Sequence, residues 1–176
     1  MFDKNNIKPL ITKEEIQKEI LNLANKLNEI YQGEELYLLC VLKGSVMFMT
    51  DLAKNLTMPI KMEFIRLSSY GSNTYSSGDV SAVDVSLSDL NNKNVSIVED
   101  IIDTGYTAKF LVDFLNKKYK TKSLRFCSLL NKRAKRQVNM EADYYCFDVE
   151  DKFLVGYGLD YDGYYRNFPY IGYVTV

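Results

Sequence analysis

The chain has 176 residues, 47% of them hydrophobic and 26% charged, with 22 basic against 23 acidic residues. This composition is typical of one globular domain, so we expect residues 1–176 to form one unit, and the near-neutral charge gives no support to a general nucleic-acid-binding protein. The longest apolar stretch, Leu36–Leu42, is too short to span a bilayer and the opening residues lack the pattern of a secretory signal, so we expect a cytoplasmic protein.

Cysteine and histidine usage narrows the possible chemistry further. Cys40, Cys127 and Cys146 each lie in an apolar run without Cys-x-x-Cys spacing, as small buried residues in a reducing compartment do. The chain has no histidine, which excludes a histidine-based triad and disfavours a zinc site. Acid–base chemistry must therefore come from Asp, Glu, Lys or Tyr.

The first third of the chain predicts two helices around a buried strand. A capping box from Thr12 to Glu15 precedes apolar residues at helical spacing, which predicts an amphipathic helix to about residue 30. Residues 36–42 show no polar alternation, which indicates a strand covered on both faces. Gly44 then turns the chain into a second helix that we expect to reach about Leu56.

A long polar loop follows the next predicted strand. Residues 60–67 predict that strand, and the segment 68–79 is rich in Ser and Gly. Loops of that length inside a compact domain are often lids, so we predict a lid hairpin at about residues 68–80. The alternating pattern of residues 80–87 predicts its returning arm.

Residues 95–107 predict a phosphate-binding turn between a buried strand and a helix. Apolar residues recur at helical spacing beyond Thr107, so the N–H groups of residues 104–107 are expected at a helix N-terminus, where they bind an anion. Gly105 lets the backbone approach a phosphate closely, and the hydroxyls of Thr104 and Thr107 add donors.

An acid pair, Glu99 and Asp100, lies near the end of the same strand. Carboxylates there are costly unless they bind a partner, and a sugar diol or a hydrated divalent cation would satisfy them.

Residues 124–130 and 143–149 predict two further strands. Alternating strands and helices predict an α/β sheet with ligands at its carboxyl edge.

The order of strand, acid pair, two apolar residues and Asp-Thr-Gly-x-Thr resembles the diphosphoribose-binding signature of the type I phosphoribosyltransferases. The form Glu-Asp-Ile-Ile-Asp-Thr-Gly is most similar to the hypoxanthine-guanine branch. Further motifs follow in the family's order between about residues 36 and 173. The resemblance implies a central, mainly parallel sheet flanked by helices, with a small hood formed by the terminal segments and a base-binding hood segment at about residues 150–176.

The resemblance also implies an activity and its residues. The reaction is transfer of the 5-phosphoribosyl group from phosphoribosyl diphosphate to hypoxanthine or guanine, in purine salvage, with Mg²⁺ as cofactor. Asp103 is the residue implied to exchange a proton with the purine. The resemblance implies that the ribose and 5-phosphate bind Glu99, Asp100, Thr104, Gly105, Tyr106 and Thr107, and that pyrophosphate binds Leu42, Lys43, Gly44 and Arg166, with a cis bond between Leu42 and Lys43. It implies that the purine binds Lys132, Phe153, Leu154 and Asp160. It also implies that Mg²⁺ binds Glu99, Asp100 and Asp160, and that Ser69 and Tyr70 belong to the lid.

Several residues have plainer interpretations without the resemblance. Phe153 would then be a core residue, Lys132 a solvated lysine, and the basic group Lys132, Arg133, Lys135 and Arg136 a solvated face. Two other functions stay open on the same fold: a regulatory protein that senses phosphoribosyl diphosphate and binds nucleic acid, and an enzyme that prefers xanthine. We expect small-molecule substrates rather than nucleic acid or membrane as partners, and a homo-oligomer, dimer or tetramer.

Overall fold

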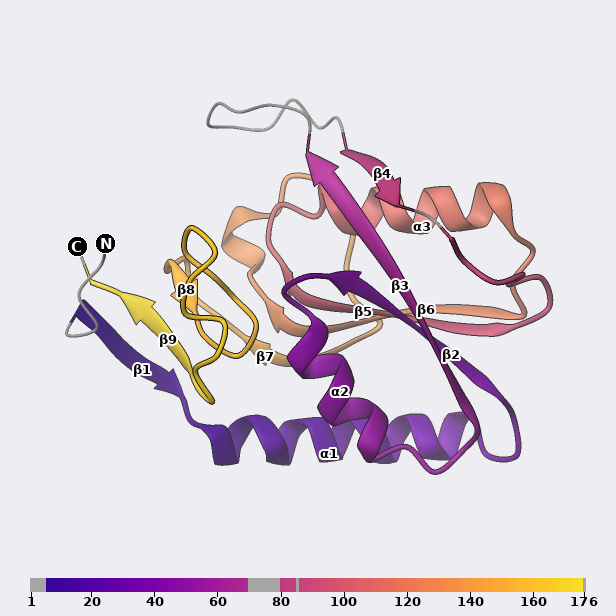
Figure 1. Cartoon of the computed structure of the whole chain (residues 1–176), viewed down its shortest axis with the longest axis horizontal. Coiled ribbons are helices and arrows are strands. Elements are labelled where there is room, and N and C mark those ends of the chain that lie inside the picture. Colours follow the sequence, from indigo (N-terminus) through magenta and orange to yellow (C-terminus); the bar gives the residue numbers. More distant parts are fainter. Residues whose placement is uncertain (1–5, 70–79, 85, 176) are drawn as a thin grey trace.

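The computed structural model describes residues 6–69, 80–84 and 86–175 (Figure 1). In chain order its elements are β1 (Ile7–Ile11), α1 (Lys13–Ile30), β2 (Leu36–Leu42), α2 (Val46–Lys54), β3 (Ile60–Ser69), β4 (Val80–Asp84), β5 (Asn94–Ile102), α3 (Tyr106–Lys118), β6 (Ser123–Asn131), the 3₁₀ helix η2 (Arg133–Lys135), β7 (Tyr144–Asp148), β8 (Leu154–Val155) and β9 (Ile171–Val174).

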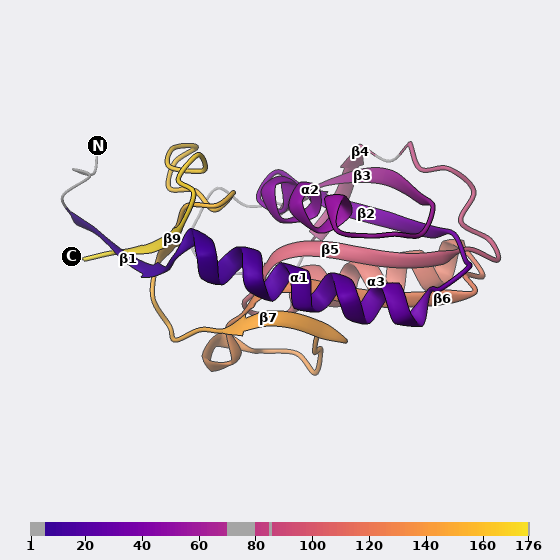
Figure 2. The same ribbon diagram turned by 90° about the horizontal axis from the view of Figure 1, so that it is seen from below.

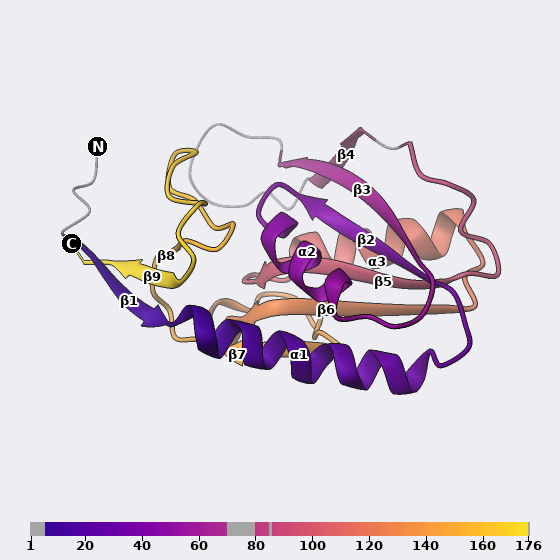
Figure 3. The ribbon, with the colours of Figure 1, turned by 60° about the horizontal axis from the view of Figure 1, so that its bottom comes forward.

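The main sheet has the strand order β4-β3-β2-β5-β6-β7. Strands β3, β2, β5, β6 and β7 pair in parallel, and only β4 pairs antiparallel, with β3. Helices α1 and α2 lie in front of the sheet and α3 lies behind it (Figure 3). The predicted α/β fold with a mainly parallel sheet flanked by helices is confirmed.

Strand β2 shows why its sequence has no polar alternation. Leu38 and Cys40 pack in the core cluster on the side of α1 and α2, whereas Leu39 and Val41 pack in the cluster on the side of α3. All four side chains are buried. Both faces of the strand therefore need apolar residues, as parallel sheets with helices on both faces require.

A separate three-stranded sheet, in the order β1-β9-β8, forms the predicted hood. β1 pairs antiparallel with β9, which brings the two ends of the chain side by side (Figure 1). The carboxyl ends of β2, β5 and β6 point toward this hood (Figure 2). The edge of the main sheet that we expect to bind ligands therefore faces the terminal segments.

The element ends follow the predicted signals with small differences. The Thr12 hydroxyl accepts a hydrogen bond from the Glu15 N–H at 3.3 Å, and the Glu15 carboxylate accepts one from the Thr12 N–H at 2.8 Å, so the capping box is confirmed. Helix α2 ends at Lys54, two residues before the expected Leu56. β4 ends at Asp84, and residues 86–90 are not strand, so the returning arm is shorter than predicted.

The predicted lid is described only at its base. Ser69 ends β3 and pairs with Val80, which begins β4. Tyr70 and the rest of the predicted lid, up to residue 79, lie outside the described residues. Among the residues that the structure describes, no helix is long and apolar enough to cross a membrane.

Candidate active site

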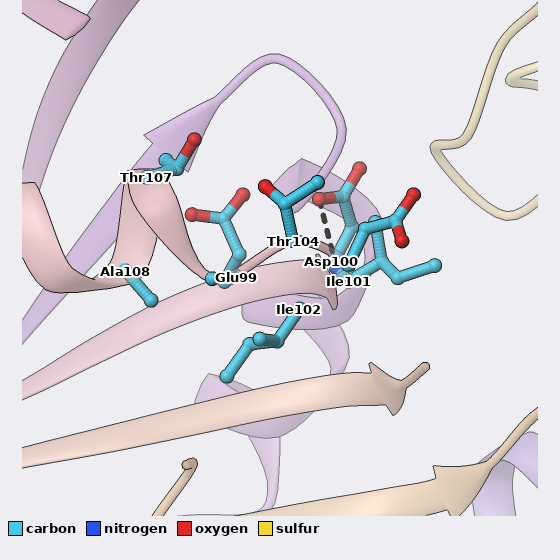
Figure 4. Close-up of a pocket in the computed structure, with 9 residues that line it drawn as sticks. Glu99, Asp100, Ile101, Ile102, Thr104, Thr107 and Ala108 are labelled. Atoms are coloured by element: carbon cyan, nitrogen blue, oxygen red, sulfur yellow. Dashed lines mark hydrogen bonds between the residues drawn. The ribbon is translucent and has the colours of Figure 1, made fainter. Parts of the chain in front are cut away.

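A cavity of about 250 Å³ opens at the carboxyl end of β5. It is lined by residues 99–105, Thr107 and Ala108, which are the end of β5, the turn after it and the first turn of α3. The carboxyl groups of Glu99 and Asp100 and the hydroxyl of Thr104 lie on the same side of the strand end, whereas Ile102 points to the opposite side (Figure 4). The predicted acid pair and phosphate-binding turn therefore share one cavity.

Glu99 is buried and Asp100 is half-buried, and the pair is poorly compensated. Glu99 is 8% exposed, and its buried Oε2 finds no hydrogen-bond partner among the described residues. Burial raises the pKa of Glu99 well above its ordinary value of 4.5, and the neighbouring Asp100 carboxylate adds to the rise. Burial also raises the pKa of Asp100, whose Oδ1 accepts a hydrogen bond from the Ile101 N–H at 2.9 Å. Such groups persist where a ligand uses them.

The N-terminus of α3 is left open toward the same cavity. Its N-cap is Gly105, with φ +90°, and no side chain caps the helix. The first turn of α3 contains no acidic residue that would offset the positive end of the helix dipole. A left-handed conformation strongly favours glycine at this position. The free N–H groups at this helix end suit a phosphate.

Lys132 is buried beside Asp103 and is not a solvated lysine. The residue is 7% exposed, and its Nζ lies 3.7 Å from Asp103 Oδ2 and 3.5 Å from Asp151 Oδ1. The other Asp103 oxygen, Oδ1, is buried and finds no hydrogen-bond partner among the described residues. A donor and an acceptor thus stand side by side at the mouth of the site.

The turn after β2 packs directly against Asp100. The peptide bond between Leu42 and Lys43 is cis, as the resemblance implied. A Cβ added at Gly44 would lie 1.6 Å from Asp100 Oδ2, and a Cβ added at Gly158 would lie 1.9 Å from the Gly44 carbonyl oxygen. Side chains at these two positions would separate the surfaces, so the two glycines allow the β2 turn to fit between Asp100 and the C-terminal segment.

Asp160 and Arg166 are paired with each other in the C-terminal segment. Arg166 Nη2 lies 2.6 Å from Asp160 Oδ1, and Arg166 Nη1 donates to the Gly158 carbonyl at 2.5 Å. Asp160 Oδ2 accepts a hydrogen bond from the Gly163 N–H at 2.7 Å. Both residues thus belong to the segment that contacts the β2 turn. Among the described residues, no three metal-ligating side chains form a cluster, so Asp160 does not join Glu99 and Asp100 in one.

Two of the predicted purine-contacting residues, Phe153 and Leu154, lie next to each other at the start of β8. Phe153 is 53% exposed, which rules out the interpretation as a core residue, and its ring meets Tyr161 edge-on at a centroid distance of 5.3 Å. Leu154 begins β8 and is buried. An exposed aromatic face beside a buried strand end suits a flat heterocycle.

Two contacts near the site were not predicted from the sequence. The Arg136 side chain is 11% exposed and donates from Nε to the main-chain carbonyl of Asp103 at 3.2 Å, so the prediction of a solvated arginine is wrong. The Tyr157 hydroxyl donates to Asp51 Oδ2 at 2.7 Å, which ties the C-terminal segment to α2. Each contact joins residues more than 30 positions apart, and no local pattern in the sequence marks either of them.

Comparisons with known proteins agree with this arrangement. The family model described as phosphoribosyl transferase domain matches residues 10–162. A hypoxanthine-guanine phosphoribosyltransferase of Streptococcus thermophilus is 42% identical over 172 residues, which cover 98% of this chain and 95% of that protein. The protein of the same name from Bacillus subtilis is 42% identical over 165 residues, covering 94% of this chain and 91% of the relative.

Solved structures give the same result. A hypoxanthine-guanine phosphoribosyltransferase of Bacillus anthracis matches with a TM-score of 0.90 and 39% identity, covering 96% of this chain and 98% of that one. A hypoxanthine phosphoribosyltransferase of Staphylococcus aureus matches with a TM-score of 0.92 and 40% identity, covering 97% and 93%. The chain therefore belongs to the phosphoribosyltransferase family.

Proposed function

We propose that the chain is a purine salvage enzyme that transfers the 5-phosphoribosyl group from phosphoribosyl diphosphate to hypoxanthine or guanine, giving IMP or GMP and pyrophosphate. The relatives named above carry that activity in their names and match nearly the whole chain. The observation that carries the proposal is the cavity in which the acid pair of Glu99 and Asp100, the uncapped end of α3 and Asp103 come together.

The cavity supplies separate contacts for the sugar and its phosphate. In the proposed complex, the N–H groups of residues 104–107 and the hydroxyls of Thr104 and Thr107 hold the 5-phosphate, with Tyr106 at the first position of α3. The Glu99 and Asp100 carboxylates accept hydrogen bonds from the ribose hydroxyls. This assignment gives the buried carboxylate oxygen of Glu99 the partner that it lacks within the protein.

Pyrophosphate binds in our proposal to the turn Leu42-Lys43-Gly44 and to Arg166. The turn lies against Asp100, and Arg166 is held near it through the Gly158 carbonyl. In this proposal the departing group lies beside Asp100, against which the turn packs. Positive charge from the lysine and the arginine would offset the charge that develops on the leaving group.

We propose Mg²⁺ as the cofactor, bound by Glu99 and Asp100, with Asp160 as a further ligand. Protein sites for Mg²⁺ commonly supply one or two carboxylates while substrate phosphates and water complete the coordination, so the acid pair fits this ion. Asp160 would have to exchange its contact with Arg166 for the metal. The ion would neutralise charge on the diphosphate during its departure.

The purine binds in our proposal between the hood and β6. Phe153 offers its ring for stacking, Leu154 and Asp160 line the base, and the Lys132 ammonium donates to the 6-oxo group. Asp103, whose Oδ2 lies 3.7 Å from Lys132 Nζ, exchanges a proton with the purine ring nitrogen. Ser69 and Tyr70 are proposed to close over the reaction centre and exclude water.

We further propose a homo-oligomer, a dimer or a tetramer, in the cytoplasm. Met62 and Phe64 on β3 are 45% and 44% exposed, and Met47 on the neighbouring α2 is 42% exposed, which leaves apolar surface for a second copy to cover. All three cysteines are free thiols, as in a reducing compartment. Light scattering at micromolar concentration measures the number of subunits.

Turnover of a panel of purines tests the proposal. Hypoxanthine, guanine, xanthine and adenine are incubated separately with phosphoribosyl diphosphate and Mg²⁺, and nucleotide products are separated by chromatography. We expect IMP and GMP, with adenine used at least roughly 10³-fold less well. Xanthine as the best substrate would favour the xanthine-preferring enzyme, and no product with any purine would refute the enzymatic function.

A further inference from the structure

The loop that joins β5 to α3 is held from behind by the segment that follows β6. We call residues 132–137 the strap. The Lys132 N–H donates to the Ile102 carbonyl at 2.9 Å, Arg136 Nε donates to the Asp103 carbonyl at 3.2 Å, and the Gln137 N–H donates to the Thr104 carbonyl at 2.9 Å. Three consecutive carbonyls, that of the last residue of β5 and those of the first two loop residues, are thus oriented by one segment.

The strap also sets the direction of the loop's N–H groups. In a trans peptide the carbonyl of one residue and the N–H of the next point in opposite directions. Because the carbonyls of Asp103 and Thr104 point toward the strap, the N–H groups of Thr104 and Gly105 point away from it. Strap residues do not line the cavity, whereas Thr104 and Gly105 do. The strap therefore supports the phosphate-binding turn from the side opposite the ligand.

Arg136 is the one contact of the three that depends on a side chain, and all three of its guanidinium nitrogens make contacts. Nη1 donates to the Met140 carbonyl, Nη2 donates to Asn131 Oδ1 at 2.7 Å, and Nη1 lies 3.4 Å from Glu141 Oε1. Asn131 is fully buried and donates in turn to Asp148 Oδ1 at 2.9 Å. The arginine is thus anchored to β6 and β7 before it reaches the loop.

The aliphatic part of Arg136 adds a second constraint on the turn. A Cβ added at Gly105 would lie 2.9 Å from Arg136 Cδ, so the arginine packs against the glycine that caps α3. A shift of the arginine would therefore release both the Asp103 carbonyl and the support beneath Gly105. Sub-ångström displacement of binding groups lowers turnover strongly in preorganised sites.

We propose that Arg136 is a positioning residue, which holds the Asp103–Gly105 turn so that its N–H groups meet the 5-phosphate and the Asp103 carboxylate meets the purine. The inference rests on the proposed function and extends it to a residue that does not contact substrate. The strap also carries Lys132, so one segment sets the phosphate end and the base end of the site together.

The test measures how much the 5-phosphate adds to binding. Calorimetry gives the dissociation constants of guanosine and GMP, and their ratio isolates the contribution of the phosphate. Arg136→Met removes every donor but keeps an unbranched side chain, so the ratio and kcat should each fall roughly tenfold or more. Arg136→Lys keeps one donor group and should recover part of both. The affinity for inorganic pyrophosphate, which binds the β2 turn, should stay at the wild-type value.

Arg133→Met is the matched control. Arg133 lies on the same strap but is exposed, and it contacts Asp148 at 3.3 Å and the Tyr145 hydroxyl at 3.1 Å. Its removal should leave the guanosine-to-GMP ratio unchanged. If Arg136→Met fails to show a cooperative unfolding transition, Arg136→Lys decides the question. A wild-type guanosine-to-GMP ratio in the folded Arg136 variants, or equally weakened binding of guanosine and GMP, would overturn the inference. A wild-type protein without transferase activity would refute the proposed function instead.

Discussion

Replacing Glu99 with Gln tests whether the acid pair is kept for binding at the expense of stability. The Glu99 carboxylate is buried, has an oxygen without a hydrogen-bond partner among the described residues, and has a raised pKa because burial disfavours its charged form. The amide is nearly the same shape and carries no charge. We therefore expect Glu99→Gln to stabilise the free protein and to weaken binding of phosphoribosyl diphosphate.

The size of the stability effect follows from proton linkage. Between the ordinary pKa of 4.5 and the raised folded pKa of Glu99, the folded state binds more protons than the unfolded state, so the free energy of unfolding falls as pH rises. One pKa unit is worth about 1.4 kcal/mol, so at about pH 7.5 the penalty is at most about 4 kcal/mol. The amide has its own desolvation cost, so we expect a gain of about 1–3 kcal/mol.

Urea unfolding of both proteins at about pH 7.5 and about pH 5.5 measures the effect. The gain should shrink at the lower pH, because only about one unit then separates the pH from 4.5. Calorimetry with phosphoribosyl diphosphate and Mg²⁺ should show at least a roughly tenfold weaker affinity. Glu29→Gln, on the exposed end of α1, is the control and should change neither quantity. A Glu99→Gln protein that is less stable than the wild type at both pH values, or that binds the diphosphate equally well, would refute this reasoning.

Three further substitutions test the other parts of the site. Asp103→Asn keeps the shape but loses the proton acceptor, so turnover should fall roughly 10²-fold while diphosphate binding measured by calorimetry persists, and wild-type turnover would refute the assignment. Lys132→Gln replaces a donor-only ammonium with an amide that also accepts, so kcat/KM for hypoxanthine should fall. The preference for hypoxanthine over adenine, roughly 10³-fold in the wild type, should narrow. An unaltered ratio of the two kcat/KM values would place selectivity elsewhere. Gly44→Ala puts a Cβ against the Asp100 carboxylate, 1.6 Å from Oδ2, so binding of phosphoribosyl diphosphate should weaken at least about tenfold, and unchanged affinity would show that the turn moves freely.

The parts of the fold that were predicted from the sequence have strong local signals. β2 is apolar throughout because both of its faces are covered, and α1 begins at a capping box that the structure forms. The turn after β5 carries its glycine where the backbone is left-handed. In each case the residues that determine the structure are neighbours in the sequence, so the pattern could be read before the contacts were known.

The parts that were missed depend on long-range contacts. The individual strands β1, β8 and β9 were not predicted, because they are short and are stabilised by pairing between the two ends of the chain. Arg136 was predicted to be solvated because its neighbours are basic, yet the turn after β5 and β6 cover most of its side chain, which is 11% exposed. Lys132 could be placed in the site only through the resemblance, since its acid partners lie 29 and 19 positions away. Burial of a charged side chain follows from its distant partners, which composition does not reveal.

A crystal structure of the protein with phosphoribosyl diphosphate and Mg²⁺ tests the central claim most directly, because the claim assigns each group of one ligand to a stated part of the cavity. The account predicts the 5-phosphate at the N–H groups of residues 104–107, the ribose hydroxyls at Glu99 and Asp100, and the diphosphate at the turn after β2. A surface groove between α1 and β7, lined by Glu19, Lys26 and Tyr144 among others, offers a comparable volume of about 310 Å³. A ligand bound in that groove, with the β5 cavity unchanged, would contradict the account.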